Sequence, residues 1–180
     1  MRLLIAASLL LCTSAFAGPG HAHDDAEGCM QGPMAQFGRY IGDWRIDDET
    51  LAQDDSGWSE GAGARWRFEC VGGGVAVQDY WMPLTGGFGT NLRTYNPSTD
   101  SWEIVWTAKL SPGLQRISAR ENEAGEVVMS IDYPTPPQPR RIIFYPPKDG
   151  GWNWAMQWSL DEGKTWFDVY RIKATPWVDD

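Results

Sequence analysis

Histidine is nearly missing from this sequence, and its scarcity removes several kinds of functional site. The chain of 180 residues holds two histidines, His21 and His23, both close to the N-terminus. A haem bound through His, a zinc ion held by three His and a Ser-His-Asp catalytic triad all need imidazole within the folded domain. Two His beside Asp24 and Asp25 are compatible with a surface metal site, but we interpret them as ordinary residues of a loose arm. We therefore expect no metal site and no cofactor.

Long apolar runs are also absent, except at the start of the chain. Residues 1–17, MRLLIAASLLLCTSAFA, combine the charged Arg2 with an apolar run and a final Ala15-Phe16-Ala17. This is the pattern of a cleaved signal peptide. No later segment approaches the roughly 18 apolar residues of a membrane span. We expect an exported protein, periplasmic or secreted, without stable membrane insertion.

Cysteine is scarce too, with three in the chain. If Cys12 leaves with the signal peptide, Cys29 and Cys70 remain as an even pair in an oxidising compartment, which favours a disulfide. Closing a loop of about 42 residues would contribute roughly 4 kcal/mol and tie the N-terminal arm to the body. The alternative is a free thiol at Cys70, but no His or basic cluster nearby in sequence would lower its pKa.

Basic residues are too few to favour a polyanionic partner. Fifteen Lys and Arg stand against 24 Asp and Glu, which gives a formal net charge of −9. Phosphate backbones and anionic membrane surfaces are therefore poor partners, and we expect no nucleic-acid binding. The composition leaves the oligomeric state open.

Helical periodicity is absent from most of the chain. Residues 18–33 are rich in Gly and Asp and predict a flexible arm, whereas residues 34–180 fit a single domain that opens with a short helix over 34–41. Beyond it, short β-branched and aromatic runs are bounded by Gly, Pro, Asn and Asp clusters. Strands are predicted over 42–48, 62–70, 74–82, 88–95, 101–108, 114–121, 125–132, 140–145, 151–159 and 165–173.

Ten short strands without room for crossover helices indicate an all-β antiparallel meander. Several strands alternate, as where Trp102, Ile104 and Trp106 share one face. One apolar and one wetter face suit a sheet rolled around a core, and closure removes exposed sheet edges. A closed barrel is therefore the first prediction and a two-sheet sandwich the second.

The stretch SLDEGKTW at 159–166 matches the Asp-box motif S-x-D-x-G-x-T-W, which recurs on the blades of sialidase-type propellers. A propeller needs its motif to recur every 40 to 50 residues or so, and here it occurs once. In a single copy, the Ser and Asp cap a tight turn and the Gly supplies a positive φ. We interpret the stretch as a hairpin turn and not as a sign of a glycosidase.

The segment FGRYIGDW at 37–44 places a short helical entry before Gly-Asp-Trp at the first strand, and it resembles the G-x-W opening of lipocalins. In those families the Trp closes the barrel floor against a basic residue of the last strand. The resemblance implies this structural role for Trp44, with Arg171 as its partner.

Further stretches extend the likeness: GTNLRTYN at 89–96, the pair Trp102 and Trp106, and the Asp-box. Together they resemble bacterial lipocalin-like, calycin-type domains of uncharacterised function. Ten strands exceed the eight of lipocalins proper and are similar to fatty-acid-binding barrels, although the two-helix lid of that family is absent. The resemblance implies a barrel that holds a small hydrophobic or amphipathic molecule.

Candidate side chains that would contact such a ligand can be identified from their residue types. The tryptophans at 66, 81, 106 and 154 could line a pocket or simply fill the core, and Trp is unusually abundant at eleven. Arg93 and Tyr95 share a face of one strand and could hold a carboxylate between them. However, Phe88 and Leu92 have the opposite parity, so an apolar interior there would turn Arg93 and Tyr95 outward.

An enzyme is the second hypothesis and a filled structural or interaction barrel the third. Catalysis without a metal, by an isomerase, lyase or hydrolase, would need a positioned acid-base pair. Asp168 and Tyr170 share a strand face by simple alternation and are weak catalytic candidates, whereas the adjacent Asp79 and Tyr80 point to opposite faces. The size of the interior cavity should separate a filled barrel from the other two.

Overall fold

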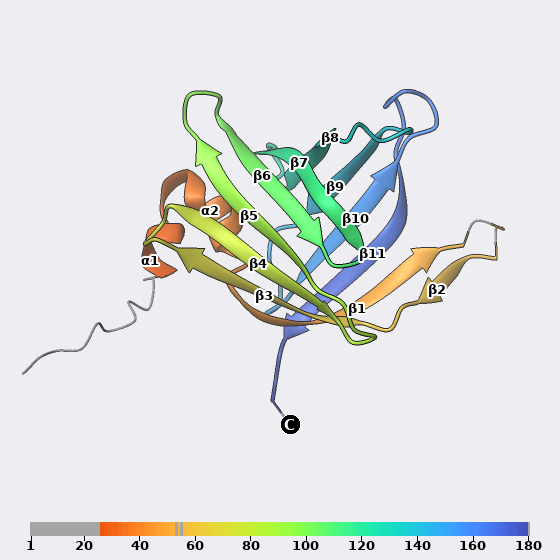
Figure 1. Ribbon diagram of the computed structural model, residues 1–180, viewed down its shortest axis with the longest axis horizontal. Coiled ribbons are helices and arrows are strands. Elements are labelled where there is room, and N and C mark those ends of the chain that lie inside the picture. Colours follow the sequence, from red (N-terminus) through yellow and green to blue (C-terminus); the bar gives the residue numbers. More distant parts are fainter. Residues whose placement is uncertain (1–25, 53, 55, 180) are drawn as a thin grey trace, which may run out of the picture.

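The computed structural model describes residues 26–52, 54 and 56–179. The expected signal peptide, the first part of the expected arm, and His21 and His23 lie outside these residues. Figure 1 shows a barrel of antiparallel strands with short helices packed at one end.

The strands follow one another around the barrel in chain order, and pairing of β11 with β1 closes it. Ten strands form the closed barrel, so the predicted meander and barrel are confirmed and the sandwich alternative is wrong. The barrel strands are β1 (Gly42–Leu51), β3 (Ala64–Val71), β4 (Ala76–Pro83), β5 (Gly89–Asn96), β6 (Ser101–Ala108), β7 (Ser111–Glu121), β8 (Val127–Tyr133), β9 (Arg140–Phe144), β10 (Trp152–Trp158) and β11 (Phe167–Pro176).

One strand was not predicted from the sequence. β2 (Trp58–Glu60) pairs with the second half of β1, beyond the part of β1 that pairs with β3. It makes a projecting hairpin beside the barrel (Figure 1). Three residues next to Gly and Ser give too little alternation to identify a strand.

A short helical segment closes one end of the barrel. It comprises α1 (Ala26–Cys29), a 3₁₀ turn (Gly32–Met34) and α2 (Ala35–Gly38), and we call it the plug. Phe37 and Tyr40 are fully buried, and the Phe37 ring lies 4.8 Å from that of Trp102 in an edge-on arrangement. The Trp102 indole also donates a hydrogen bond of 2.8 Å to Gln36. The plug therefore belongs to the core.

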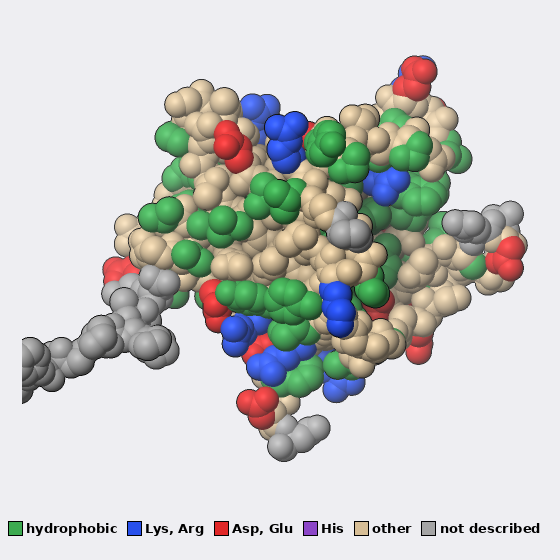
Figure 2. Space-filling model, viewed as in Figure 1, with side chains coloured by type: hydrophobic (Ala, Val, Ile, Leu, Met, Phe, Trp, Pro, Cys, Tyr) green, Lys and Arg blue, Asp and Glu red, His purple; other side chains and the backbone are tan. Residues whose placement is uncertain are grey.

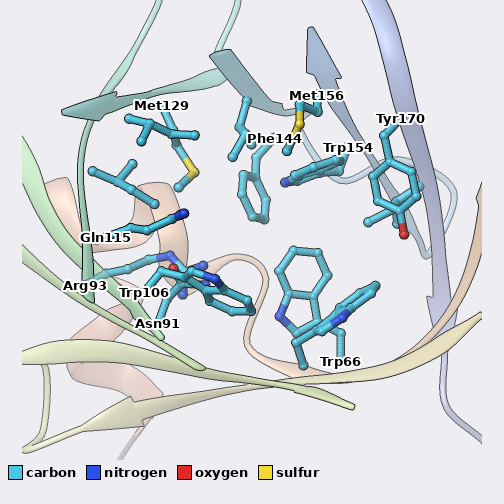
Figure 3. Close-up of a pocket in the computed structure, with 15 residues that line it drawn as sticks. Trp66, Asn91, Arg93, Trp106, Gln115, Met129, Phe144, Trp154, Met156 and Tyr170 are labelled. Carbon is cyan, nitrogen blue, oxygen red and sulfur yellow. The ribbon is translucent and has the colours of Figure 1, made fainter. Parts of the chain in front are cut away.

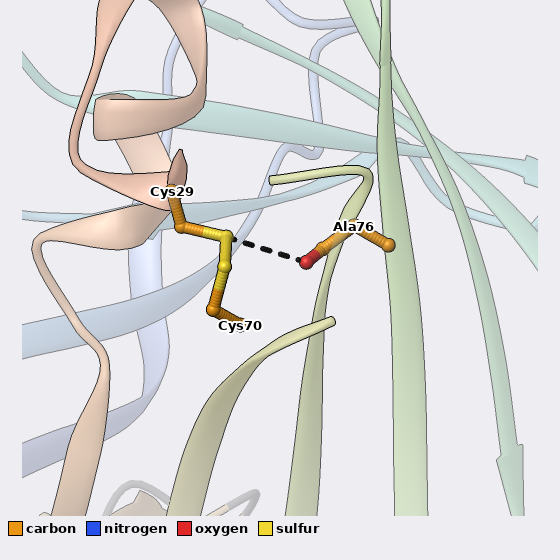
Figure 4. Close-up of a disulfide and its surroundings, with 3 residues drawn as sticks. All are labelled: Cys29, Cys70 and Ala76. Carbon is orange, nitrogen blue, oxygen red and sulfur yellow. Dashed lines mark hydrogen bonds between the residues drawn. A yellow bond between two sulfur atoms is a disulfide. The ribbon is translucent and has the colours of Figure 1, made fainter. Parts of the chain in front are cut away.

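The disulfide between Cys29 and Cys70 is present and fixes the plug to β3 (Figure 4). The Cys29 sulfur lies 3.4 Å from the Ala76 carbonyl oxygen, which is a packing contact because a disulfide sulfur carries no hydrogen. A Cβ on Gly28 would fall 1.9 Å from the carbonyl oxygen of Gly73, so backbone meets backbone here. Residues 26–33 of the expected arm carry α1 and the start of the 3₁₀ turn, and the disulfide at the buried Cys29 joins them to β3.

In an antiparallel meander, alternate turns fall at opposite ends. The turns after β3, β5, β7 and β9 lie at the plug end, where Arg39 bonds the Gly125 carbonyl and Tyr40 bonds that of Tyr145. The loops after β4, β6, β8 and β10 therefore surround the opposite end, which we call the mouth.

The Asp-box forms the mouth turn between β10 and β11. Asp161 accepts hydrogen bonds from the backbone and hydroxyl of Thr165, at 2.8 and 2.7 Å, and from the Ser159 hydroxyl. These bonds, those of Thr165 first, lower the pKa of Asp161 to about 2. Gly163 has φ +90°. The motif therefore does the folding work expected of a hairpin turn.

Candidate functional site

The barrel encloses a cavity of about 260 Å³, lined by side chains from every strand between β3 and β11. The four tryptophans proposed as ligand contacts, Trp66, Trp81, Trp106 and Trp154, all line it, as does Arg93. Figure 3 labels Arg93 and three of these tryptophans, Trp66, Trp106 and Trp154. The remaining lining residues are Asn91, Gln115, Ile117, Met129, Ile131, Ile142, Phe144, Met156, Tyr170 and Ile172.

Burial distinguishes the base of the cavity from its entrance. Arg93 and Phe144 are 0% and 1% exposed, and the Arg93 guanidinium carbon lies 4.8 Å from the ring centroid of Phe37 in the plug. The half-buried lining residues are Trp81, Trp106, Gln115, Ile131, Met156 and Tyr170. The cavity therefore rests on the plug and opens towards the mouth.

One wall of the cavity is aromatic. Trp66 meets Trp81 edge-on at 5.0 Å between ring centroids and lies 5.7 Å from Phe144. Trp154 meets Tyr170 edge-on at 5.6 Å. Edge-to-face packing fixes the rings relative to one another and leaves flat faces available to an apolar guest.

Trp106 occupies its position because β5 begins with glycine. A Cβ on Gly89 would lie 2.2 Å from the Trp106 ring, closer than real Cβ contacts come. Gly89 pairs with Ala108 on the neighbouring strand, so the absence of a side chain leaves room for the indole. A small residue on β5 therefore determines how far Trp106 projects into the cavity.

The polar side of the cavity, at its base, contains a buried ion pair. Arg93 Nη2 donates to Asp79 Oδ2, and both side chains are fully buried. Asn91 adds its backbone N–H, 3.0 Å from Asp79 Oδ1, and its side-chain amide, 2.9 Å from Oδ2. Both carboxylate oxygens are thus hydrogen-bonded, which is the condition for a buried carboxylate to be tolerated.

Arg93 is less completely satisfied than its partner. Its Nε and Nη1 atoms are buried and find no hydrogen-bond acceptor among the described residues. The guanidinium lies near the rings of Phe37, Phe68 and Phe144, at 4.8, 5.2 and 5.8 Å, where cation-π attraction contributes. These two nitrogens at the base of the cavity therefore remain available to an acceptor.

The direction of Arg93 follows from the alternation of β5. Gly89, Asn91 and Arg93 are buried, whereas Leu92 is 39% exposed. Figure 2 shows apolar side chains dispersed over the outer face in the region of β4 to β6. On this strand the apolar residue faces solvent and the polar residues face the interior, the reverse of the usual pattern.

Tyr95 does not join Arg93 in the cavity. It lies nearer the plug end of β5, packs edge-on against Trp102 at 5.6 Å, and its hydroxyl donates to Asp100. It is not among the residues that line the cavity. Because Tyr95 does not line the cavity and its hydroxyl is bonded to Asp100, the hypothesis of a carboxylate clamp between Arg93 and Tyr95 is not supported.

Asp168 and Tyr170 do not share a strand face. Met156 pairs with Tyr170 and Gln157 pairs with Asp168, so Val169 is an extra residue and forms a β-bulge. Tyr170 points into the cavity, whereas Asp168 bonds Gln157 and Arg171. The expectation from simple alternation was wrong because a bulge reverses the parity.

Tyr170 is instead coupled to β1. Its hydroxyl donates a 2.7 Å hydrogen bond to Asp48 Oδ2, while Asp48 Oδ1 accepts from the Gly63 N–H at 2.8 Å. Burial first, and then this bond and the charge of Asp48, raise the pKa of Tyr170 above its usual 10.0. The phenol is therefore a neutral donor and serves to join β11 to β1.

Trp44 and Arg171 are also apart. Trp44 lies opposite Pro176 on β11 and donates from its indole to the Tyr40 carbonyl at 2.8 Å. The Arg171 guanidinium lies 4.0 Å from the Trp58 ring on the β1–β2 hairpin. The partnership implied by the lipocalin resemblance is not formed, because Arg171 lies five positions before Pro176 on β11.

Sequence reasoning missed three polar residues of the site. Asp79 had been considered only for its neighbour Tyr80, while Asn91 and Gln115 had not been considered. Asn91 and Arg93 have the same parity on β5, and Asp79 has the parity of the buried Val77 and cavity-lining Trp81. The signal that could have found Asp79 and Asn91 was therefore the two-residue alternation of inward-facing positions along the adjacent strands β4 and β5.

Comparison with known proteins does not assign the chain to a family. It matches no protein-family model and no curated protein. Within residues 26–52, 54 and 56–179, no helix is long and apolar enough to span a membrane. In the same part of the chain, no three His, Cys, Asp or Glu side chains are grouped as a metal site would require.

Proposed function

We propose that this chain is an exported lipocalin-like barrel that binds one small hydrophobic or amphipathic molecule in its interior. The observation that carries the proposal is the cavity of about 260 Å³ inside a closed barrel, with Trp side chains on its wall and Arg93 at its base. Ligand pockets are characteristically apolar hollows with a few convergent polar groups.

The size of the cavity favours a compact guest. It lies just below the roughly 300 Å³ at which pockets for drug-sized ligands begin, and well above the approximately 150 Å³ of an engineered apolar cavity that takes up benzene. A guest with one or two rings matches this volume. A barrel whose tryptophans served only to fill the core would leave less space.

The remaining features are compatible with this role. The barrel supports the lipocalin likeness, and the disulfide is consistent with an oxidising compartment outside the cytoplasm. The plug lies at one end of the cavity and the half-buried rim at the other, so the guest would enter through the mouth. The strand order leaves the cavity wall continuous from β3 to β11.

Native mass spectrometry of the protein recovered from an oxidising compartment tests the proposal directly. Added mass that is lost on denaturation supports a carrier and delivers its ligand for identification. The recovered protein is then titrated with 1-aminonaphthalene, an apolar fluorophore. Failure of the native protein to carry added mass and to bind the fluorophore refutes the proposal.

A matched pair of variants locates the binding. Ile131→Trp enlarges a side chain on the cavity wall, whereas Val105→Trp enlarges one that is 38% exposed on the outer face of β6. We expect the first to weaken fluorophore binding at least tenfold and the second to leave it unchanged. Equal effects would mean that the fluorophore binds outside the cavity.

A further inference from the structure

The hydrogen-bonding capacity at the base of the cavity is asymmetric. Asp79 accepts from Asn91 through both carboxylate oxygens and from Arg93 through one, so its acceptor capacity is largely used. Arg93, in contrast, has Nε and Nη1 buried and unpaired among the described residues. No acceptor among the described residues reaches these two atoms, and a complementary guest should bring one.

Charge restricts what that acceptor can be. Arg93 is the one charged side chain among the residues that line the cavity, and Asp79 already neutralises it by direct contact. An ionised carboxylate on the guest would place a second negative charge beside a single buried cation. Because an unbalanced charge is costly in a low-dielectric interior, a neutral acceptor is favoured.

The aromatic wall of the cavity favours the rest of the guest. Trp66, Trp154 and Phe144 present an apolar surface within the same cavity as Arg93 (Figure 3). Gln115 lines the polar wall with an uncharged amide that can donate as well as accept. The arrangement suits a flat apolar body with one uncharged polar group.

We propose that the cavity selects an uncharged carbonyl compound, such as an aromatic ketone, ester or lactone. Its carbonyl oxygen would accept from the Arg93 guanidinium at Nε or at Nη1, and its ring would lie against the tryptophans. The inference rests on the proposed function and adds the chemical class of the ligand. It also departs from the sequence-based hypothesis of a carboxylate held by Arg93 and Tyr95.

Three probes of nearly equal shape test the acceptor requirement by calorimetry at pH 8. Acetophenone is a neutral ketone, α-methylstyrene replaces its oxygen with CH₂, and benzoate carries a carboxylate. We expect acetophenone to bind about tenfold more tightly than α-methylstyrene, as a hydrogen bond to a charged donor allows, and also more tightly than benzoate.

Each alternative outcome has a distinct meaning. If benzoate binds most tightly, the site takes anions and the inference is overturned. If acetophenone and α-methylstyrene bind equally, the aromatic rings already satisfy Arg93 and the inference also fails. If none of the three binds but 1-aminonaphthalene does, the ligand class is wrong while the binding function stands. If the fluorophore also fails to bind, both fall together.

Weak benzoate binding could result from the negative charge of Asp79 or from the general cost of removing a carboxylate from water. The variant Asp79→Asn distinguishes these two causes. The variant keeps the shape of the side chain but leaves Arg93 as an uncompensated cation. We expect benzoate affinity to rise at least tenfold and acetophenone affinity to change less than threefold. Benzoate should also raise the melting temperature of this variant more than that of the wild type. Unchanged benzoate binding by a folded variant would show that Arg93 does not face the guest.

Discussion

Removing one partner of the Asp79–Arg93 pair should destabilise the protein far more than replacing both. Both side chains are fully buried, so either single substitution leaves a charge without its counter-ion. Such losses cost about 3–5 kcal/mol, whereas replacing a buried pair with apolar residues is often close to neutral. We predict this cost for Arg93→Met and for Asp79→Leu.

Asn91 sets the expected result for the double variant. Its backbone N–H and side-chain amide both donate to Asp79, so Asp79→Leu leaves these donors unpaired even when Arg93 is also replaced. An unsatisfied buried polar group costs roughly 1–3 kcal/mol. The double variant should therefore be about 1–3 kcal/mol less stable than wild type. The sum of the two single-variant costs should exceed the cost measured for the double variant by at least about 2 kcal/mol.

Urea unfolding of the four oxidised proteins, followed by tryptophan fluorescence, measures each term of this double-mutant cycle. The far-ultraviolet circular dichroism of each variant serves as a control for the fold. Additive single costs, with a coupling below about 0.5 kcal/mol, would refute the reasoning, because independent sites add within that margin. Such a result would mean that the two charges do not meet in the folded interior.

Three further predictions concern the plug, the cavity wall and the coupling of the sheet. Replacing Cys29 and Cys70 together by Ser should lower the free energy of unfolding by up to about 4 kcal/mol in urea; an unchanged midpoint would exclude a stabilising crosslink. Gly89→Ala should drive Trp106 into the cavity, altering near-ultraviolet circular dichroism and weakening 1-aminonaphthalene binding, since its Cβ would lie 2.2 Å from the ring. Tyr170 has a native pKa above its usual 10.0, so the unfolded chain releases this proton first and stability is lost as pH rises beyond 10. Tyr170→Phe should therefore show a shallower decline of unfolding free energy between pH 9 and 11.5, by up to about 1.4 kcal/mol per pH unit, and an identical slope would contradict the assignment.

Much of the barrel could be predicted because strand signals are local. Each of the ten predicted strands overlaps an observed one, since β-branched and aromatic alternation and the intervening turns act within a few residues. The Asp-box turn was predictable for the same reason, because Ser159 and Thr165, both within four residues of Asp161, donate to its carboxylate. The disulfide followed from counting cysteines.

The sequence-based predictions of side-chain position were wrong in two situations. In one, an extra residue changed which face of a strand the following side chains occupy, and in the other, the two predicted partners are distant in sequence. The extra Val169 places Asp168 and Tyr170 on different faces, and alternation alone cannot locate a bulge. Arg171 was assigned to Trp44 through resemblance, yet its position along β11 depends on a register set by the whole closed sheet. Pairings of this kind are decided by the assembled barrel.

The inverted pattern of β5 connects these observations to function. On β3, Trp66 and Phe68 are buried, and on β6, Trp102 and Ile104 are buried, as an apolar interior requires. On β5 the interior receives Asn91 and Arg93, while Leu92 is left 39% exposed. A barrel serving only as a structural unit would be more stable with the opposite arrangement, because burying Leu is favourable and burying an ion pair brings little net gain. Positions where the local sequence pattern disagrees with the fold, as on β5, are expected at functional sites. The residues of β5 that made the interior face hard to predict from sequence are thus the ones that give the cavity its polar wall.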